Sequence, residues 1–319
     1  MNKDLFLNLY KKLLLVRMCE EKIIEEYKNN EMKTPVHLGI GAEAIPVGTC
    51  SALPSGFKAF GTYRNHALYL TMTENTSLFF AELYGKVTGS NRGKAGSMHL
   101  SAPEVGLIAT SAVVSTTIPV AVGAAFAEQY KGTNNFVIVF FGDGAVEEGV
   151  FWESLNFAAL KKLKIIFVCE DNNLAIHTET KDRQGFKSIE DIPSLFNFYT
   201  AQIPGHDLLE LYKSTSEMVE SMEKECKPGF IHTKYFRLLE HVGPNEDFAA
   251  GYRLKPPIEE LKKIDPILCL EEKFKIYSID PNQLSAIRDS INIKIEDSIE
   301  FAKQSPFPNN DQLLADIYI

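Results

Sequence analysis

The sequence predicts an α/β protein with three layers, in which helices cover both faces of a mostly parallel β-sheet. Two apolar runs of strand length, 136–141 and 165–169, flank a stretch with helical periodicity, 148–163. A strand, a helix and a second strand in this order form a β-α-β unit, whose strands run parallel. The alternation is repeated over 199–235, which favours a layered α/β/α fold. A run of small residues, 120–125, predicts a closely packed buried helix.

Length and composition are those of one large domain. The 319 residues can bury a sizeable core. We expect a single domain over 1–319, with an N-terminal amphipathic helix at about 3–29 and a helical C-terminal extension at about 256–319. The net charge of −9 without a basic cluster argues against nucleic-acid binding.

Several sequence features bear on location and on other kinds of site. The sequence contains no apolar stretch long enough to cross a bilayer, and its first residues lack the apolar core of a signal peptide. We therefore expect a cytoplasmic protein without a membrane role. The five cysteines are scattered and form no CxxC pair, so neither a zinc site nor a disulfide framework is indicated.

Polar side chains follow both strands of the β-α-β unit at their carboxyl ends. Asp143 stands in a Gly-Asp-Gly turn after the first strand, and Asn172 follows the second. Neighbouring parallel strands lie about 4.8 Å apart, so a carboxylate and an amide oxygen can converge there on a small hard cation. Mg²⁺ prefers oxygen ligands and often shares them with a phosphate. Gly144 permits close approach of a phosphate, and the backbone N–H of Ala145 favours an anion.

These residues belong to a segment that resembles the thiamine-diphosphate motif, GDGAVEEGVFWESLNFAALKKLKIIFVCEDNN. Its flanks, over about 36–253, resemble the alpha subunit of two-chain 2-oxo acid dehydrogenases, the group that contains the pyruvate, branched-chain and acetoin enzymes. The resemblance implies a thiamine-diphosphate-binding fold with thiamine diphosphate and Mg²⁺ as cofactors. It also implies that Asp143, Asn172 and the backbone carbonyl of Leu174 hold the Mg²⁺, which binds the diphosphate.

The same resemblance assigns three histidines to the catalytic site. His37, in VHLGIGAEA, matches a histidine that faces the substrate. In GTYRNHA, Tyr63 and Arg64 match the pair that contacts the diphosphate, and His66 lies at the edge of the site. His241 lies in a loop, FRLLEHVGPNEDFAAGYR, that is long enough for a lid, and it matches a histidine that reaches the cofactor. Without the resemblance, a solitary histidine of this kind is more often structural.

The remaining cofactor assignments precede the Gly-Asp-Gly turn. The segment 88–100, TGSNRGKAGSMHL, resembles a family loop that lies over the diphosphate end of the cofactor. Ala102, Ala112 and Val114 complete the cofactor-binding set, and Val114 matches the position that props the cofactor between its two rings. Ala112 and Ser115 stand where glycines are common in the family, a departure that leaves the substrate open.

The resemblance thus implies the alpha subunit of a 2-oxo acid or acetoin dehydrogenase, which passes an acyl group to a lipoyl domain or another acceptor. A separate beta subunit would supply the glutamate that contacts the aminopyrimidine ring, in an α2β2 assembly, and a lipoyl acyltransferase would be a further partner. Three alternatives stay open: a transketolase-like half-enzyme, a biosynthetic thiamine-diphosphate enzyme without a lipoyl complex, and a non-catalytic scaffold. The intact Asp143 and Asn172 argue against the scaffold.

Overall fold

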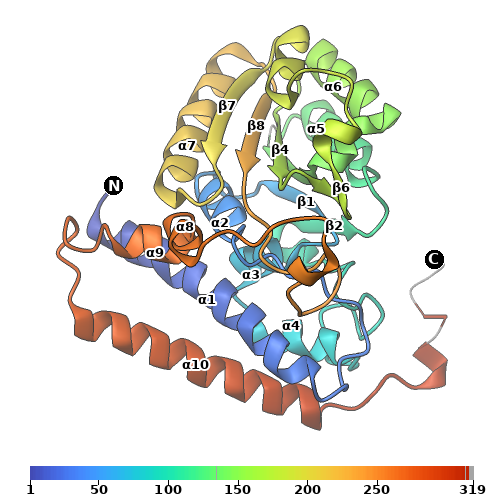
Figure 1. Ribbon diagram of the computed structural model, residues 1–319. Helices are drawn as coiled ribbons and strands as arrows, with labels where there is room; N and C mark the ends of the chain where they lie inside the picture. Colours follow the sequence, from blue (N-terminus) through green and yellow to red (C-terminus); the bar gives the residue numbers. More distant parts are fainter. Residues whose placement is uncertain (134, 313, 316–319) are drawn as a thin grey trace.

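A six-stranded parallel sheet forms the centre of the molecule (Figure 1). The computed structural model describes residues 1–133, 135–312 and 314–315. The spatial order of the strands is β2-β1-β3-β4-β8-β7, and each neighbouring pair is parallel. A short antiparallel hairpin, β5-β6, forms a second sheet. The strands are β1 (Lys58–Thr62), β2 (Leu107–Ser111), β3 (Val137–Gly142), β4 (Ile165–Asp171), β5 (Leu174–Ala175), β6 (Thr178–Glu179), β7 (Tyr199–Pro204) and β8 (Gly229–Lys234).

Alternate residues of the central strands face two different cores. In β3, Ile138 and Phe140 belong to one cluster of buried side chains, whereas Val139 and Phe141 belong to another. Successive side chains of a strand point to opposite faces of a sheet, so one core lies on each side. Burial on both faces explains why β3 and β4 are continuous apolar runs rather than alternating ones.

Helices cover both faces of the sheet, which confirms the expected three-layer α/β/α fold. Side chains of α5 and α6 fill the core on one face, and those of α1, α2, α3 and α7 fill the core on the other. Figure 1 shows α7 and α6 on opposite sides of the strands. The helices are α1 (Lys3–Tyr27), α2 (Ala44–Ser51), α3 (His66–Thr73), α4 (Thr76–Leu83), α5 (Thr117–Lys131), α6 (Gly149–Lys161), α7 (Leu208–Glu225), α8 (Ile258–Lys263), α9 (Pro266–Glu271) and α10 (Pro281–Gln304).

The two ends of the chain pack together. Helix α10 runs beside α1 and α4 (Figure 1), and its Ile291, Ile295 and Ile299 join the same core as α1. This shared core joins the two ends of the chain, and the single domain stays a prediction. Residues 313 and 316–319 of the expected C-terminal extension lie outside the described residues. Within the described part of the chain, no helix is both long enough and apolar enough to span a membrane.

The expected helix over 120–125 is present as part of α5, but the expectation that it is buried holds for only one of its faces. Helix α5 buries Ala121, Val122 and Ala125 against the sheet, but Val120 is 55% exposed. The small residues of this run therefore serve two surfaces, one packed on the sheet and one facing outward.

Candidate functional site

A cavity of about 290 Å³ opens where the carboxyl ends of β1, β3 and β4 meet. In the register of the sheet, Gly142 of β3 pairs with Glu170 of β4. Asp143 and Asn172 therefore leave the sheet side by side. Most residues assigned from the sequence line this cavity: Tyr63, Arg64, Val114, Asp143, Gly144, Ala145, Asn172, Leu174 and His241.

Asp143 is a buried carboxylate at this edge, with a side chain that is 1% exposed. Burial, together with the nearby Asp171, raises its pKa, and the Arg183 guanidinium partly offsets the rise. Nη2 of Arg183 lies 2.5 Å from Oδ2 of Asp143. Gln184 donates from Nε2 to the Asp143 carbonyl at 3.2 Å. Sequence reasoning missed both partners because they lie in an irregular segment without a periodic pattern.

Asn172 presents a free oxygen to the same edge. Its Nδ2 donates to the hydroxyl of Tyr235 at 3.0 Å, whereas its buried Oδ1 has no hydrogen-bond partner within the described residues. The next residue, Asn173, has a φ of 65° and donates its N–H to Oδ1 of Asp171 at 2.8 Å. This local turn holds the orientation of Asn172. Buried polar groups in proteins are almost always partnered, so the orphaned oxygen indicates a place for a ligand.

The donors present fit Mg²⁺ better than a softer metal. Among the described residues, no group of three or more His, Cys, Asp or Glu side chains is arranged to hold a metal. The edge instead offers one carboxylate, from Asp143, and one amide oxygen, from Asn172, with Leu174 in the adjoining hairpin β5-β6. Hard cations take such oxygen ligands, and Mg²⁺ usually completes its shell with water and phosphate oxygens.

Three rings form a cluster beside the cavity. The His37 ring lies 4.4 Å from that of Tyr63 and 5.2 Å from that of His241, between ring centres. Burial, and then the Arg64 charge, lower the pKa of His37 to about 3 and that of His241 to about 4. Both imidazoles are therefore neutral near pH 7. His37 does not line the cavity but touches two residues that do.

Arg64 lines the cavity and also fastens two segments of chain together. Its guanidinium donates to the carbonyl of Leu38 at 2.5 Å and to the carbonyl of His241 at 3.2 Å. These bonds hold the His241 loop against the segment that carries His37. The assignment of Arg64 to the diphosphate stays a prediction.

Besides His37, three assigned residues lie outside the lining of the cavity, and their roles in the site stay untested predictions. His66 is fully buried, with Nε2 2.7 Å from Oγ of Ser97 and its ring against Phe79, so its side chain lies in the core. Ala102 is buried in a bridge to Leu107. Ala112 is half-buried and is not among the lining residues.

Ser115 explains one of the departures noted in the sequence. Its φ is 66°, a conformation that glycine adopts without strain. The serine compensates through a hydrogen bond from its Oγ to the Ala145 carbonyl at 3.2 Å. It therefore ties the segment before α5 to the turn that carries Asp143.

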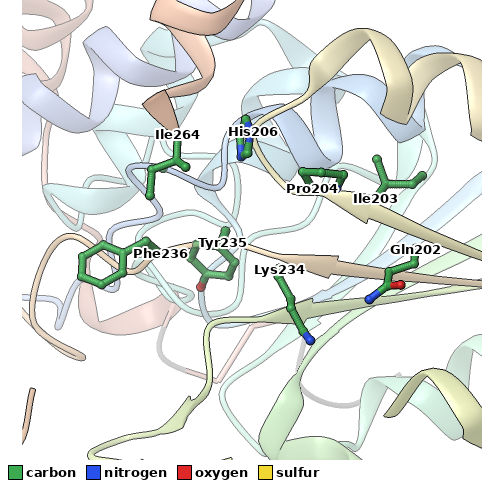
Figure 2. A pocket seen from close by; sticks show the side chains of 9 residues that line it. Gln202, Ile203, Pro204, His206, Lys234, Tyr235, Phe236 and Ile264 are labelled. Carbon is green, nitrogen blue, oxygen red and sulfur yellow. The ribbon is translucent and has the colours of Figure 1, made fainter. Parts of the chain in front are cut away.

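Two larger cavities lie next to this one, so the volume of a cavity does not identify the functional site. A cavity of about 530 Å³ lies at the ends of β7 and β8, where Tyr235, Phe236 and His206 line it (Figure 2). Another of about 640 Å³ shares Asn172 and Tyr235 with the site. The 530 Å³ cavity contains none of the residues assigned from the sequence, and the choice therefore rests on Asp143 and Asn172.

Comparison with known proteins gives one consistent family. A family model described as "Dehydrogenase E1 component" matches residues 10–311. The alpha subunit of acetoin:2,6-dichlorophenolindophenol oxidoreductase from Bacillus subtilis is 32% identical, over 98% of this chain and 92% of the relative. The pyruvate dehydrogenase E1 component subunit alpha of Rickettsia typhi is 30% identical, over 99% of this chain and 97% of the relative.

Proposed function

Because the chain belongs to the dehydrogenase E1 component family and is an enzyme subunit of the alpha type, we propose that it binds thiamine diphosphate and Mg²⁺ and acts in a 2-oxo acid or acetoin dehydrogenase. One observation carries the proposal. The buried carboxylate of Asp143 and the unpartnered Oδ1 of Asn172 face one cavity at the carboxyl edge of the sheet. This is where ligands bind in open α/β sheets.

Residues around the cavity suit the parts of the cofactor. Asp143, Asn172 and the carbonyl of Leu174 would hold Mg²⁺, and the backbone at Gly144 and Ala145 would receive the diphosphate. The rest of the cofactor would contact other residues that line the cavity: Val114, Tyr63, Arg64 and His241. When bound, thiamine diphosphate supplies the nucleophilic carbon and the electron sink for cleavage of the bond next to the carbonyl.

The two imidazoles of the ring cluster suit proton transfer. A neutral histidine can accept a proton at one ring nitrogen and donate from the other. Nδ1 of His37 is buried without a hydrogen-bond partner within the described residues, and His241 lines the cavity beside Tyr63. We assign to them the holding or moving of a proton near the substrate carbonyl. The low pKa of each, about 3 and about 4, keeps both rings neutral near pH 7, so that each holds one proton on a ring nitrogen and can donate it in a hydrogen bond to the carbonyl.

A beta subunit fits the surface next to the cavity. We define the α5–α6 face as the exposed apolar side chains Val120, Phe126, Tyr130, Phe157 and Leu160. The two helices pack together, and the Phe126 and Phe157 rings meet at 5.7 Å. Val114, which lines the cavity, is 50% exposed and comes just before α5. An exposed apolar surface of this kind marks an interaction site, and a partner that extended to the start of α5 would also cover Val114.

The proposal is tested by calorimetric titration of thiamine diphosphate into the full-length chain, with and without its beta partner, in the presence of Mg²⁺. We expect binding to the wild type and none to Asp143→Ala. The reconstituted pair is then assayed with acetoin, pyruvate and branched-chain 2-oxo acids, with dichlorophenolindophenol as the electron acceptor. Cofactor binding without turnover of any of these, but with ketol transfer between sugar phosphates, would replace the proposal with the transketolase-like alternative.

A further inference from the structure

Arg183 is the closest cation to the carboxylate on which the proposed metal site depends. Its Nη2 lies 2.5 Å from Oδ2 of Asp143 and 3.2 Å from Oγ1 of Thr180, and its Nη1 is paired with Glu147. Its Nε donates to the Thr178 carbonyl at 3.0 Å. The Arg183 side chain is 9% exposed and that of Asp143 is 1% exposed. The ion pair is therefore largely shielded from water. Charges in such a buried place interact more strongly than charges at a surface.

The charges around the cavity determine how easily a diphosphate can enter it, and they give the Arg183–Asp143 pair its importance. Four carboxyl groups line the cavity, those of Asp143, Glu147, Glu148 and Glu170. Burial raises the pKa of Glu170 to about 8, so this group is mostly neutral near pH 7. The only cationic side chain that lines the cavity within the described residues is Arg64. Arg64 already donates to two backbone carbonyls. A diphosphate entering this cavity would meet net negative charge unless further cations stood beside it.

From this arrangement we propose that Arg183 couples metal binding to diphosphate binding. The inference rests on the proposed function. A guanidinium is permanently charged, so a divalent cation that approaches Asp143 alone must compete with Arg183 for the same carboxylate. When a diphosphate is present, its negative charge can balance both cations. The guanidinium group of Arg183 then moves from the Asp143 carboxylate to a phosphate oxygen. Metal alone binds weakly, and metal with diphosphate binds tightly.

The position of Arg183 in the chain suits such a turn. It follows the short 3-10 helix Thr180–Asp182, next to hairpin β5-β6. The same hairpin contains Leu174, and Ala175 would lie 3.1 Å from a Cβ added to Gly144. The cation and the proposed metal ligand are thus joined by one short piece of chain. A movement of Arg183 toward the phosphate would keep this hairpin over the Gly-Asp-Gly turn, because Gln184 still donates to the Asp143 carbonyl at 3.2 Å.

The test measures Mn²⁺ binding by electron paramagnetic resonance of the free ion, on the full-length chain, without and with thiamine diphosphate. In Arg183→Gln we expect the Mn²⁺ affinity without thiamine diphosphate to rise about tenfold, because the competing cation is removed. With Mn²⁺ saturating, the affinity for thiamine diphosphate should fall about tenfold, because a charge-assisted contact is lost. Arg183→Lys keeps the positive charge but lacks the planar guanidinium group. It should bind Mn²⁺ alone as weakly as the wild type, and it should lose part of the affinity for thiamine diphosphate.

Lys181→Met is the matched control, since Lys181 is 71% exposed in its side chain and pairs with Glu179 at 2.6 Å. A merely structural Arg183 would make Arg183→Gln bind Mn²⁺ more weakly in both conditions, which overturns the inference. Unchanged Mn²⁺ affinity overturns it as well. If the wild type binds no Mn²⁺ even with thiamine diphosphate, the proposed function fails together with it. Should Arg183→Gln not fold, Arg183→Lys decides: full wild-type affinity for thiamine diphosphate would reject the phosphate contact.

Discussion

Asn172 and Tyr235 are joined by a hydrogen bond, from Nδ2 to the tyrosine hydroxyl at 3.0 Å, that fixes which atom of the amide faces the cavity. Loss of the hydroxyl in Tyr235→Phe frees the amide to rotate and to present its N–H₂ group. We expect the Mn²⁺ affinity in the presence of thiamine diphosphate to fall about tenfold. The free energy of unfolding should fall by only about 1 kcal/mol, because one hydrogen bond is lost. Mn²⁺ titration and urea unfolding measure the two effects.

Tyr199→Phe is the control for Tyr235→Phe. The Tyr199 hydroxyl also makes hydrogen bonds, to the Ser221 carbonyl at 3.2 Å and to the Glu225 side chain, but these lie at the end of α7, away from the cavity. It should leave Mn²⁺ binding unchanged. Equal Mn²⁺ affinities in wild type and Tyr235→Phe would show that this contact does not orient the amide.

The sequence was sufficient for the fold and for the two oxygen donors because both depend on local patterns. Continuous apolar runs mark strands that are buried on both faces, and β3 and β4 follow those runs. Once the crossover between them is helical, Asp143 and Asn172 must leave the sheet at the same edge. No residue contact had to be known in advance.

The rest of the site depends on contacts between distant segments. His66 lies on the segment that carries Tyr63 and Arg64, but helix α3 begins at His66 and turns it toward Ser97. Arg183 lies after hairpin β5-β6, in a segment whose course no periodicity indicates. Asp171 did leave a signal in the sequence: Asp followed by two Asn residues at the end of an apolar run is typical of an Asx turn.

Asp171 ties the Asn172 turn to β8 and to the segment after the hairpin. Its Oδ2 lies 2.9 Å from Nε2 of the buried His232, whose Nδ1 lies 3.1 Å from Oε1 of Glu190. Asp171→Ala removes both this hydrogen bond and the acceptor for the Asn173 N–H, and leaves buried partners unsatisfied. We expect a stability loss of about 3 kcal/mol and weaker Mn²⁺ binding, measured by urea unfolding and Mn²⁺ titration.

Glu190→Ala separates the two effects of Asp171→Ala. It breaks the outer contact of His232 but leaves the Asn173 turn intact. This variant should be less stable than the wild type and bind Mn²⁺ normally. Weakened Mn²⁺ binding in Glu190→Ala to the level of Asp171→Ala would contradict a specific role for the turn.

The histidines of the ring cluster predict a stability that falls in acid. Burial lowers the pKa of His37 to about 3 and that of His241 to about 4, whereas an unfolded histidine has a pKa of about 6.5. Between these values the unfolded chain binds more protons, so stability rises with pH. The contribution is fully present above about pH 6.5 and is lost as the pH falls toward about 4.

Urea unfolding at about pH 7 and about pH 5 measures this contribution. His37→Asn removes one of the two groups, so the loss of unfolding free energy between the two pH values should be smaller than in the wild type. A loss of the same size in both proteins would mean that His37 is as easily protonated in the folded chain as in the unfolded one.

Removal of either imidazole should slow turnover and spare the metal. In His37→Ala and His241→Ala of the reconstituted pair we expect kcat to fall about a hundredfold, the usual range for a lost proton-transfer group. Neither residue is among the proposed metal ligands, so the Mn²⁺ affinity with thiamine diphosphate should stay at the wild-type value. Wild-type turnover in both variants would remove the two histidines from the mechanism.

The α5–α6 face should control association with the beta subunit. Leu160 is 71% exposed on α6 and lies outside both cores, so Leu160→Glu should fold normally. It places an unpaired charge in an apolar interface, where the cost of its desolvation is not recovered. We expect size-exclusion chromatography of the co-expressed subunits to show separate chains.

Lys224→Glu, at an exposed position of α7 on the opposite side of the sheet, is the control and should leave the complex intact. A complex that survives Leu160→Glu and Phe157→Glu together would locate the beta subunit on another surface.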